Sequence, residues 1–196
     1  IGLRSEEGRD GNLLGGWSDS SVWDLAGTSI FDPVLCEISY RWFCPPGGQV
    51  VDPFSGGSVR GIVAVELGRK YWGSDLRKVQ IEANERQCAE VKPAGKPVWV
   101  CGDSESTLVK APPADLVFSC PPYGDLEKYS DDPADLSNMP HEDMLAKYAA
   151  ILSLAAAKLK KDRFFVMVVG DFRDKDGKLR DFVSSTIRIC RRAGLS

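Results

Sequence analysis

The sequence has little of what a metal site or a disulfide scaffold needs. It contains a single histidine, His141, and its six cysteines include no Cys-x-x-Cys pair and no spacing typical of metal ligands. We therefore expect no metal site. The N-terminus carries no apolar export signal, so reduced thiols in a cytosolic compartment are the simpler interpretation of the cysteines.

Long apolar runs and an excess of positive charge are also missing. No run approaches the roughly 20 apolar residues that cross a bilayer, so we expect no membrane association. The net charge is −3, which argues against a protein that coats nucleic acid by charge alone, because that requires clustered Lys and Arg. An enzyme with a local basic surface, for example around Arg77-Lys78, remains compatible with this composition.

The chain does contain alternating strand and helix patterns in a length of 196 residues, enough for one domain with a core. We expect an irregular arm over 1–28, rich in Gly, Ser and Asp, and a single domain over 29–196. Strands are predicted at 49–54, 70–74, 98–101, 115–119 and 163–169, and helices at 32–43, 58–67, 76–91, 142–159 and 179–192. This order predicts an α/β, doubly wound, mostly parallel sheet covered on both faces. The strands at 98–101 and 164–169 are almost wholly apolar, as expected for strands buried on both faces.

Polar motifs follow three successive predicted strands. In such folds ligands bind beyond the carboxyl ends of the strands. The first strand runs into 52–58, Asp-Pro-Phe-Ser-Gly-Gly-Ser, whose glycines permit a sharp turn and whose Ser58 suits a helix N-cap. Asp75 and Asp103 follow the next two strands, and a carboxylate there can accept both hydroxyls of a ribose. Either Asp alone is explained as an N-cap, but three such signals together favour a ligand site.

The most specific stretch follows the fourth strand and reads Cys120-Pro121-Pro122-Tyr123. Two prolines fix the backbone and remove two donors, so their carbonyls are free to accept hydrogen bonds from a ligand. Tyr123 then offers a planar aromatic face. Carbonyl acceptors beside an aromatic face suit a flipped-out base that carries an amino group.

Together these motifs resemble those of the DNA amino-methyltransferases, which methylate adenine N6 or cytosine N4. The first motif is similar to the family's Asp-Pro-Phe-x-Gly-x-Gly, and 120–123 is similar to its Asp, Asn or Ser followed by Pro-Pro-Tyr or Pro-Pro-Phe. The resemblance covers roughly residues 30–190. It implies a Rossmann-like methyltransferase fold, S-adenosylmethionine as cofactor, DNA as partner, and DNA methylation of the restriction–modification kind in a bacterial or phage-type cytoplasm.

The resemblance also implies roles for individual residues. Those for the cofactor are Asp52, Pro53, Phe54, Ser55 and Gly56 at the methionine part, Asp75 with Leu76 at the ribose, Asp103 with Ser104 at the adenine, and Phe31 with Asp32 closing the pocket. Those for catalysis on the target base are Cys120, Pro121, Pro122 and Tyr123.

The sequence departs from the family pattern in two places. The order Gly56-Gly57-Ser58 displaces the second glycine of the first motif, which is a small change. At Cys120 the family has an amide, hydroxyl or carboxylate, and a thiol is a weaker hydrogen-bond partner. Cytosine C5 methylation, which uses a Cys nucleophile, is disfavoured because Cys120 precedes the proline and the chain has no Glu-Asn-Val triplet.

Several alternatives stay open at this point. The acceptor could be an amino group of RNA or of a protein glutamine, and a non-catalytic cofactor-binding module would explain Cys120. A nicotinamide-dependent oxidoreductase is a further alternative, but the Gly-rich turn of this chain matches only half of the motif of that class. The fold of the family normally ends in an antiparallel hairpin, for which we find no residues after the last predicted helix, so we expect a sheet without it. Little sequence is left for target recognition, which leads us to expect an additional recognition domain or subunit.

Overall fold

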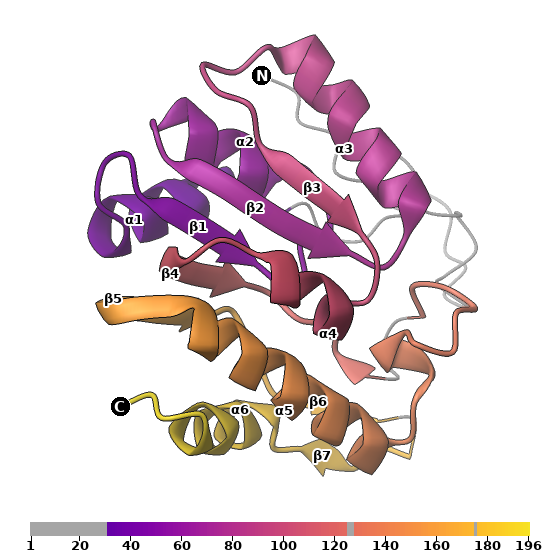
Figure 1. Ribbon diagram of the computed structural model, residues 1–196. Helices are drawn as coiled ribbons and strands as arrows, with labels where there is room; N and C mark the ends of the chain where they lie inside the picture. Colours follow the sequence, from indigo (N-terminus) through magenta and orange to yellow (C-terminus); the bar gives the residue numbers. More distant parts are fainter. Residues whose placement is uncertain (1–30, 125–127, 175) are drawn as a thin grey trace.

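A five-stranded parallel sheet forms the centre of the protein, in the order β3-β2-β1-β4-β5. The computed structural model describes residues 31–124, 128–174 and 176–196, so the predicted arm over 1–28 lies outside the described residues. The strands are β1 (Gln49–Asp52), β2 (Lys70–Asp75), β3 (Val98–Cys101), β4 (Ala114–Ser119) and β5 (Leu159–Met167). Every pairing in this sheet is parallel, so the carboxyl ends of the strands share one edge, toward which the arrows of β1 to β4 point in Figure 1.

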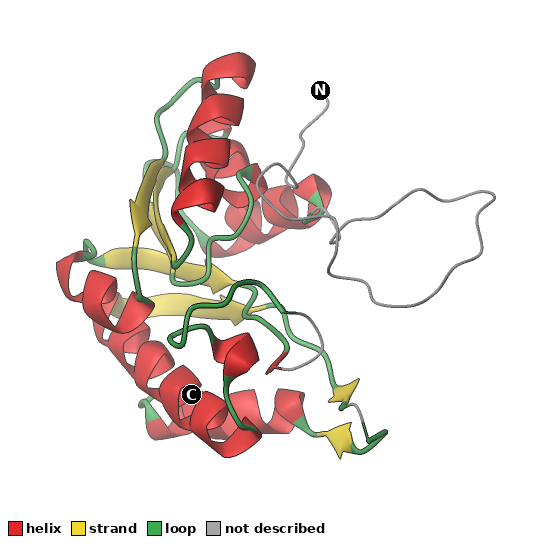
Figure 2. Ribbon diagram, turned by 90° about the vertical axis from the view of Figure 1, so that its right-hand side faces the viewer, coloured by secondary structure: helices red, strands yellow, loops and turns green. Residues whose placement is uncertain are grey.

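Helices cover both faces of this sheet, as Figure 2 shows. They are α1 (Pro33–Phe43), α2 (Val59–Glu66), α3 (Lys78–Val91), α4 (Ser104–Thr107), α5 (His141–Lys158) and α6 (Phe182–Arg192), with short 3-10 turns at Leu108–Lys110 and Leu136–Asn138. The predicted doubly wound α/β class is therefore confirmed.

Alternation along the central strands divides the core into two layers. Successive side chains of a strand point to opposite faces. Val50 of β1 accordingly packs with α1 and α2, whereas Val51 packs with Leu108 and with Ile151 of α5. Phe118 and Val117 of β4 divide in the same way. The site described below lies where these two layers meet the carboxyl ends of the strands.

The expectation that the two most apolar strands are buried on both faces is wrong. β3 and β5 are the edges of the five-stranded sheet, and Val98 and Phe164 remain 48% and 52% exposed. The most deeply buried strands are β1 and β4, which carry Asp52 and Asp115. Apolar composition did not identify the buried strands, because the central strands β1 and β4 contain carboxylates that are paired inside the protein.

The C-terminal part also differs from the prediction. Leu179 and Arg180, predicted to open the last helix, instead form β7 (Leu179–Arg180), which pairs antiparallel with β6 (Phe172–Arg173), and α6 begins at Phe182. Among the described residues, this two-stranded pair is separate from the main sheet and precedes α6. The main sheet, as far as the structure describes it, contains only parallel pairings.

Candidate functional site

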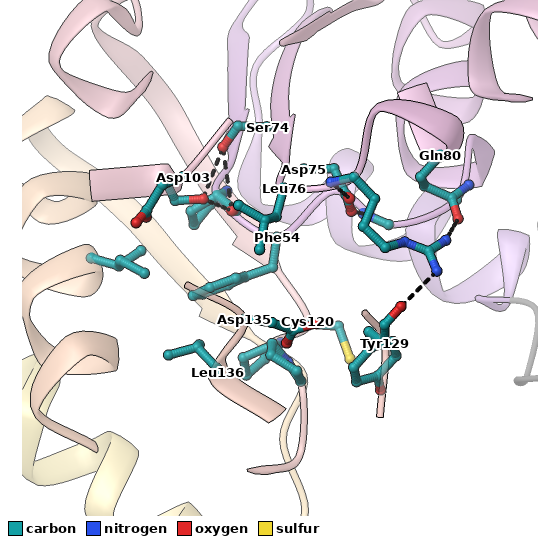
Figure 3. A pocket seen from close by; sticks show the side chains of 18 of the residues that line it. Phe54, Ser74, Asp75, Leu76, Gln80, Asp103, Cys120, Tyr129, Asp135 and Leu136 are labelled. Carbon is teal, nitrogen blue, oxygen red and sulfur yellow. Dashed lines mark hydrogen bonds between the residues drawn. The ribbon is translucent and has the colours of Figure 1, made fainter. Parts of the chain in front are cut away.

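One cavity of about 230 Å³ opens at the carboxyl ends of the strands. Most of the residues predicted from the motifs line it, although they come from five separate segments of the chain. These are Phe31, Pro53, Phe54, Gly56, Asp75, Leu76, Asp103, Ser104, Cys120, Pro121, Pro122 and Tyr123. The topology therefore brings the two carboxylates and the Pro-Pro-Tyr motif to the same cavity, and Figure 3 shows Asp75, Asp103 and Cys120 around the Phe54 side chain.

The turn after β1 is held by the next strand end. Gly56 adopts φ +49°, a conformation that favours glycine, and its N–H donates to Asp75 Oδ2 at 3.1 Å. Asp75 Oδ1 accepts from the Arg77 N–H at 2.8 Å. Ser58 stands at the N-cap position of α2, but its hydroxyl bonds to Gln87 instead of capping the helix, so that part of the prediction is wrong.

Asp103 is the N-cap of α4 and also lines the cavity. Its Oδ1 accepts from the Glu105 N–H at 3.0 Å and so caps α4, while its Oδ2 pairs with Lys147 of α5. Burial by itself would lower the pKa of Lys147, but the hydrogen bond and charge of Asp103, together with Glu105 at 3.5 Å, raise it instead. Lys147 therefore stays charged beside the cavity, where it is paired with Asp103.

Ser104 lines the cavity, but its hydroxyl is engaged with the protein. It lies 3.0 Å from the Ser74 hydroxyl and donates to the Pro53 carbonyl. The two serines thus fasten the turn after β1 to α4. The Ser104 hydroxyl therefore helps to maintain the shape of the cavity and is already engaged within the protein.

Three of the predicted residues lie outside the cavity lining. Asp32 is exposed and caps α1, accepting from the Val34 N–H at 2.7 Å, so it does not close the pocket. Ser55 is fully buried behind the turn. Asp52 is also fully buried, and its carboxylate accepts from Arg60 Nε and the Tyr71 hydroxyl, both at 2.7 Å, and from Ser119. The Asp52 carboxylate is thus bonded to groups inside the protein, where it stabilises the turn after β1.

The Pro-Pro-Tyr motif is supported by a separate aromatic cluster. The ring of Tyr123 lies 6.0 Å from those of both Phe172 and Phe182, which in turn pack with Tyr148 of α5. Cys120, Pro121 and Tyr123 line the same cavity as Asp75 and Asp103. The β6–β7 segment and α6 therefore position the aromatic face.

The acidic segment after this motif forms a wall of the cavity. Within its described part, Arg77 Nη1 donates to the Tyr129 carbonyl at 2.9 Å, and Asp135 accepts from the Ser130 hydroxyl at 2.7 Å. Tyr129 and Cys120 both line the cavity. The sequence analysis did not predict Tyr129, Arg77 or Lys147 as site residues, because each contacts a segment far away in the sequence. Only the position of Arg77, just after the end of β2, could have indicated that it lies near the site.

Among the residues that the structure describes, no group of three or more His, Cys, Asp or Glu side chains could hold a metal ion. No helix in the same part of the chain is long and apolar enough to cross a membrane.

No protein-family model and no curated protein sequence matches the chain. Solved structures do match its fold. TrmN from Thermus thermophilus is similar over 65% of this chain and 35% of its own, with 21% identity and a TM-score of 0.52. The present chain thus spans about a third of that protein.

Two further structures match more of the chain. A TehB-like SAM-dependent methyltransferase from Corynebacterium glutamicum is 19% identical over 84% of this chain and 74% of its own, with a TM-score of 0.53. Magnesium protoporphyrin IX methyltransferase from Synechocystis, solved with bound SAM, is 19% identical over 84% of this chain and 69% of its own, with a TM-score of 0.55. The chain therefore has the Rossmann-like fold of these methyltransferases.

Proposed function

We propose that this chain is an S-adenosylmethionine-dependent methyltransferase whose acceptor is an exocyclic amino group of a DNA base, adenine N6 or cytosine N4. The observation that carries the proposal is that Asp75, Asp103 and the Cys120–Tyr123 motif line one cavity. Two carboxylates at adjacent strand ends suit an adenosine, and an aromatic face in the same cavity suits a second planar ring.

The chain's own groups fit the cofactor in character. Asp75 lies at the end of β2 and can accept from ribose hydroxyls, while Asp103, one strand further out, can accept from an adenine amino group. Leu76 and Ile151 add apolar surface to the same cavity for the flat faces of the base. When bound, the cofactor supplies an electrophilic methyl group on a sulfonium centre.

The target side would hold and orient the amino group. Tyr123 stacks on the flipped base, and the Pro121 carbonyl accepts one amino N–H, so that the nitrogen lone pair points along the line of transfer. Cys120 contributes a weak hydrogen bond at this point. The proton leaves the nitrogen after the new N–C bond has formed, so a strong base is not required.

The proposal is tested by mass spectrometry of nucleosides from DNA incubated with the protein and S-adenosylmethionine. We expect N6-methyladenosine or N4-methylcytidine deoxynucleosides with the wild-type chain and about a 10- to 100-fold lower yield with Tyr123→Ala, because base–aromatic stacking contributes about 1–3 kcal/mol. Trp42→Ala is the control, since Trp42 is 73% exposed on α1 and outside the cavity lining.

Parallel reactions with RNA and with protein substrates separate the alternatives. Methyl transfer to RNA or to glutamine but not to DNA would overturn the choice of acceptor. Cofactor binding without methyl transfer to any of the three polymers would favour a non-catalytic module. This is the most informative negative result, because a non-catalytic module would explain the thiol at Cys120.

A further inference from the structure

Arg60 is a buried cation at the edge of the cavity. It lies in the first turn of α2 and is 5% exposed, yet it is one of the residues that line the cavity. Its guanidinium carbon lies 4.6 Å from the centre of the Phe31 ring, which covers it. The charge is kept by Asp52, because burial alone would lower the pKa of Arg60 and the adjacent Asp52 carboxylate raises it.

The hydrogen bonds of Arg60 leave one nitrogen unused. Nε donates to Asp52 at 2.7 Å, and Nη2 donates to the carbonyls of Phe54 and Ser55 at 2.5 and 3.0 Å. A guanidinium has five N–H donors, so these bonds account for three of them. Within the part of the chain that the structure describes, Nη1 makes no hydrogen bond, and its two N–H groups are the remaining donors.

The position of Arg60 matches one end of the cofactor. Asp75 and Asp103 would hold the ribose and the adenine at the ends of β2 and β3, so the methionine end lies toward β1 and β4, beside the turn whose carbonyls Arg60 holds. That end carries an α-carboxylate. A carboxylate is the natural partner of a desolvated guanidinium, and hydrogen bonds between charged partners are the strong ones.

We infer that Arg60 binds the α-carboxylate of the cofactor through Nη1. This rests on the proposed function and adds a specific ligand-recognition residue to it. Asp52 then acts as a positioning residue, since it holds Nε on the side of the guanidinium away from Nη1. Phe31 fixes the plane of the guanidinium and shields the pair from water.

Calorimetric binding of S-adenosylmethionine and of decarboxylated S-adenosylmethionine tests this inference. The two ligands share the nucleoside, the sulfonium and the amine and differ in the carboxylate. We expect the wild-type chain to bind the first about 10- to 100-fold more tightly, in keeping with a charge-assisted hydrogen bond. Equal affinity would overturn the inference and leave the proposed function standing, whereas no binding of either ligand would overturn both.

A variant assigns that preference to Arg60. The double variant Asp52→Asn/Arg60→Met removes both charges together and so leaves no unpaired buried ion. We expect it to bind both ligands with equal affinity, close to that of wild type for the decarboxylated ligand. A retained preference for the carboxylate would show that another group binds it and would overturn the inference.

A measurement on wild-type protein removes any dependence on the folding of that variant. In a crystal structure with bound S-adenosylhomocysteine, we expect a carboxylate oxygen within hydrogen-bond distance of Arg60 Nη1. A carboxylate placed elsewhere would overturn the inference.

Discussion

The two sides of the cavity are built in different ways. On the cofactor side, carboxylates are held by several donors each: Asp52 by Arg60, Tyr71 and Ser119, and Asp75 by two backbone N–H groups. On the target side, the walls are aromatic rings and a loop fastened through Arg77. Polar bonds fix distances and directions closely, whereas aromatic packing fixes a surface.

This difference corresponds to what each side would have to do. A cofactor that is the same in every turnover is best met by groups that do not move. A base that must enter and leave needs a face to stack on and acceptors that become engaged only when it is present. Substitutions on the two sides should therefore affect different quantities: stability and cofactor affinity on one, transfer and polymer affinity on the other.

The largest effect is expected from Asp52→Ala. It leaves Arg60 buried without its counter-charge and removes the partner of the Tyr71 hydroxyl, so we expect the free energy of unfolding to fall by about 3–5 kcal/mol. Urea unfolding followed by circular dichroism measures this.

Asp115→Ala is the matched control for that measurement. Asp115 lies at the opposite end of the sheet and pairs with Lys160 and Arg163, whose side chains are half exposed. Water screens these pairs, so the loss should be clearly smaller. Equal losses would mean that the Asp52–Arg60 pair is not the stronger element of the fold.

The next effect concerns Asp75. Asp75→Ala removes the expected acceptor of the ribose hydroxyls and releases the Gly56 N–H, so we expect about 100-fold weaker cofactor binding, from hydrogen bonds to a charged group at about 1.5–3 kcal/mol each. Stability should fall by less than with Asp52→Ala, because no buried charge loses its counter-charge. Calorimetry with S-adenosylhomocysteine measures the affinity, with the exposed Asp176→Ala as control. Unchanged affinity would remove Asp75 from the site.

The sequence located the carboxylates at the strand ends but not the packing partners of the Pro-Pro-Tyr motif, for a physical reason. Asp75 ends β2 and Asp103 comes two residues after the end of β3, so their place at the shared edge of the sheet follows from the topology alone. Phe172, Phe182 and Tyr129 come from segments whose path depends on packing against α5 and on a bond to Arg77. No local pattern encodes these contacts.

The same reasoning explains why the position of Asp52 at a strand end did not place its side chain in the cavity. Asp52 stands at the end of β1, as Asp75 stands at the end of β2, and both were predicted to meet the cofactor. The side chain of Asp52 instead lies behind the turn with Arg60, a residue that was not predicted to have any role. A strand end gives the edge of the sheet, while the direction of the side chain depends on neighbouring elements.

A smaller effect is expected at Cys120, on the target side. Cys120→Asn supplies the amide that the resembling family has at this position, and one better hydrogen bond to the amino group contributes about 1 kcal/mol. We expect roughly 5- to 10-fold faster methyl transfer with unchanged cofactor affinity, measured in single-turnover reactions. Cys88→Asn, at a half-buried thiol of α3, is the control. Slower transfer by Cys120→Asn would mean that the thiol is itself suited to its acceptor.

The smallest effect is expected from Arg77→Met. This variant distinguishes between two roles for Arg77. Arg77 could hold the loop by donating to the Tyr129 carbonyl, or it could attract DNA by charge together with its neighbour Lys78. Arg77→Met should raise the KM for DNA about 3-fold if the loop loosens, while the salt dependence of binding stays as in wild type. Lys78→Met is the matched control, because Lys78 is 81% exposed and forms a surface pair with Glu82 at 3.5 Å. If both variants raise KM equally and both flatten the salt dependence, Arg77 acts by charge and the loop is held by other contacts.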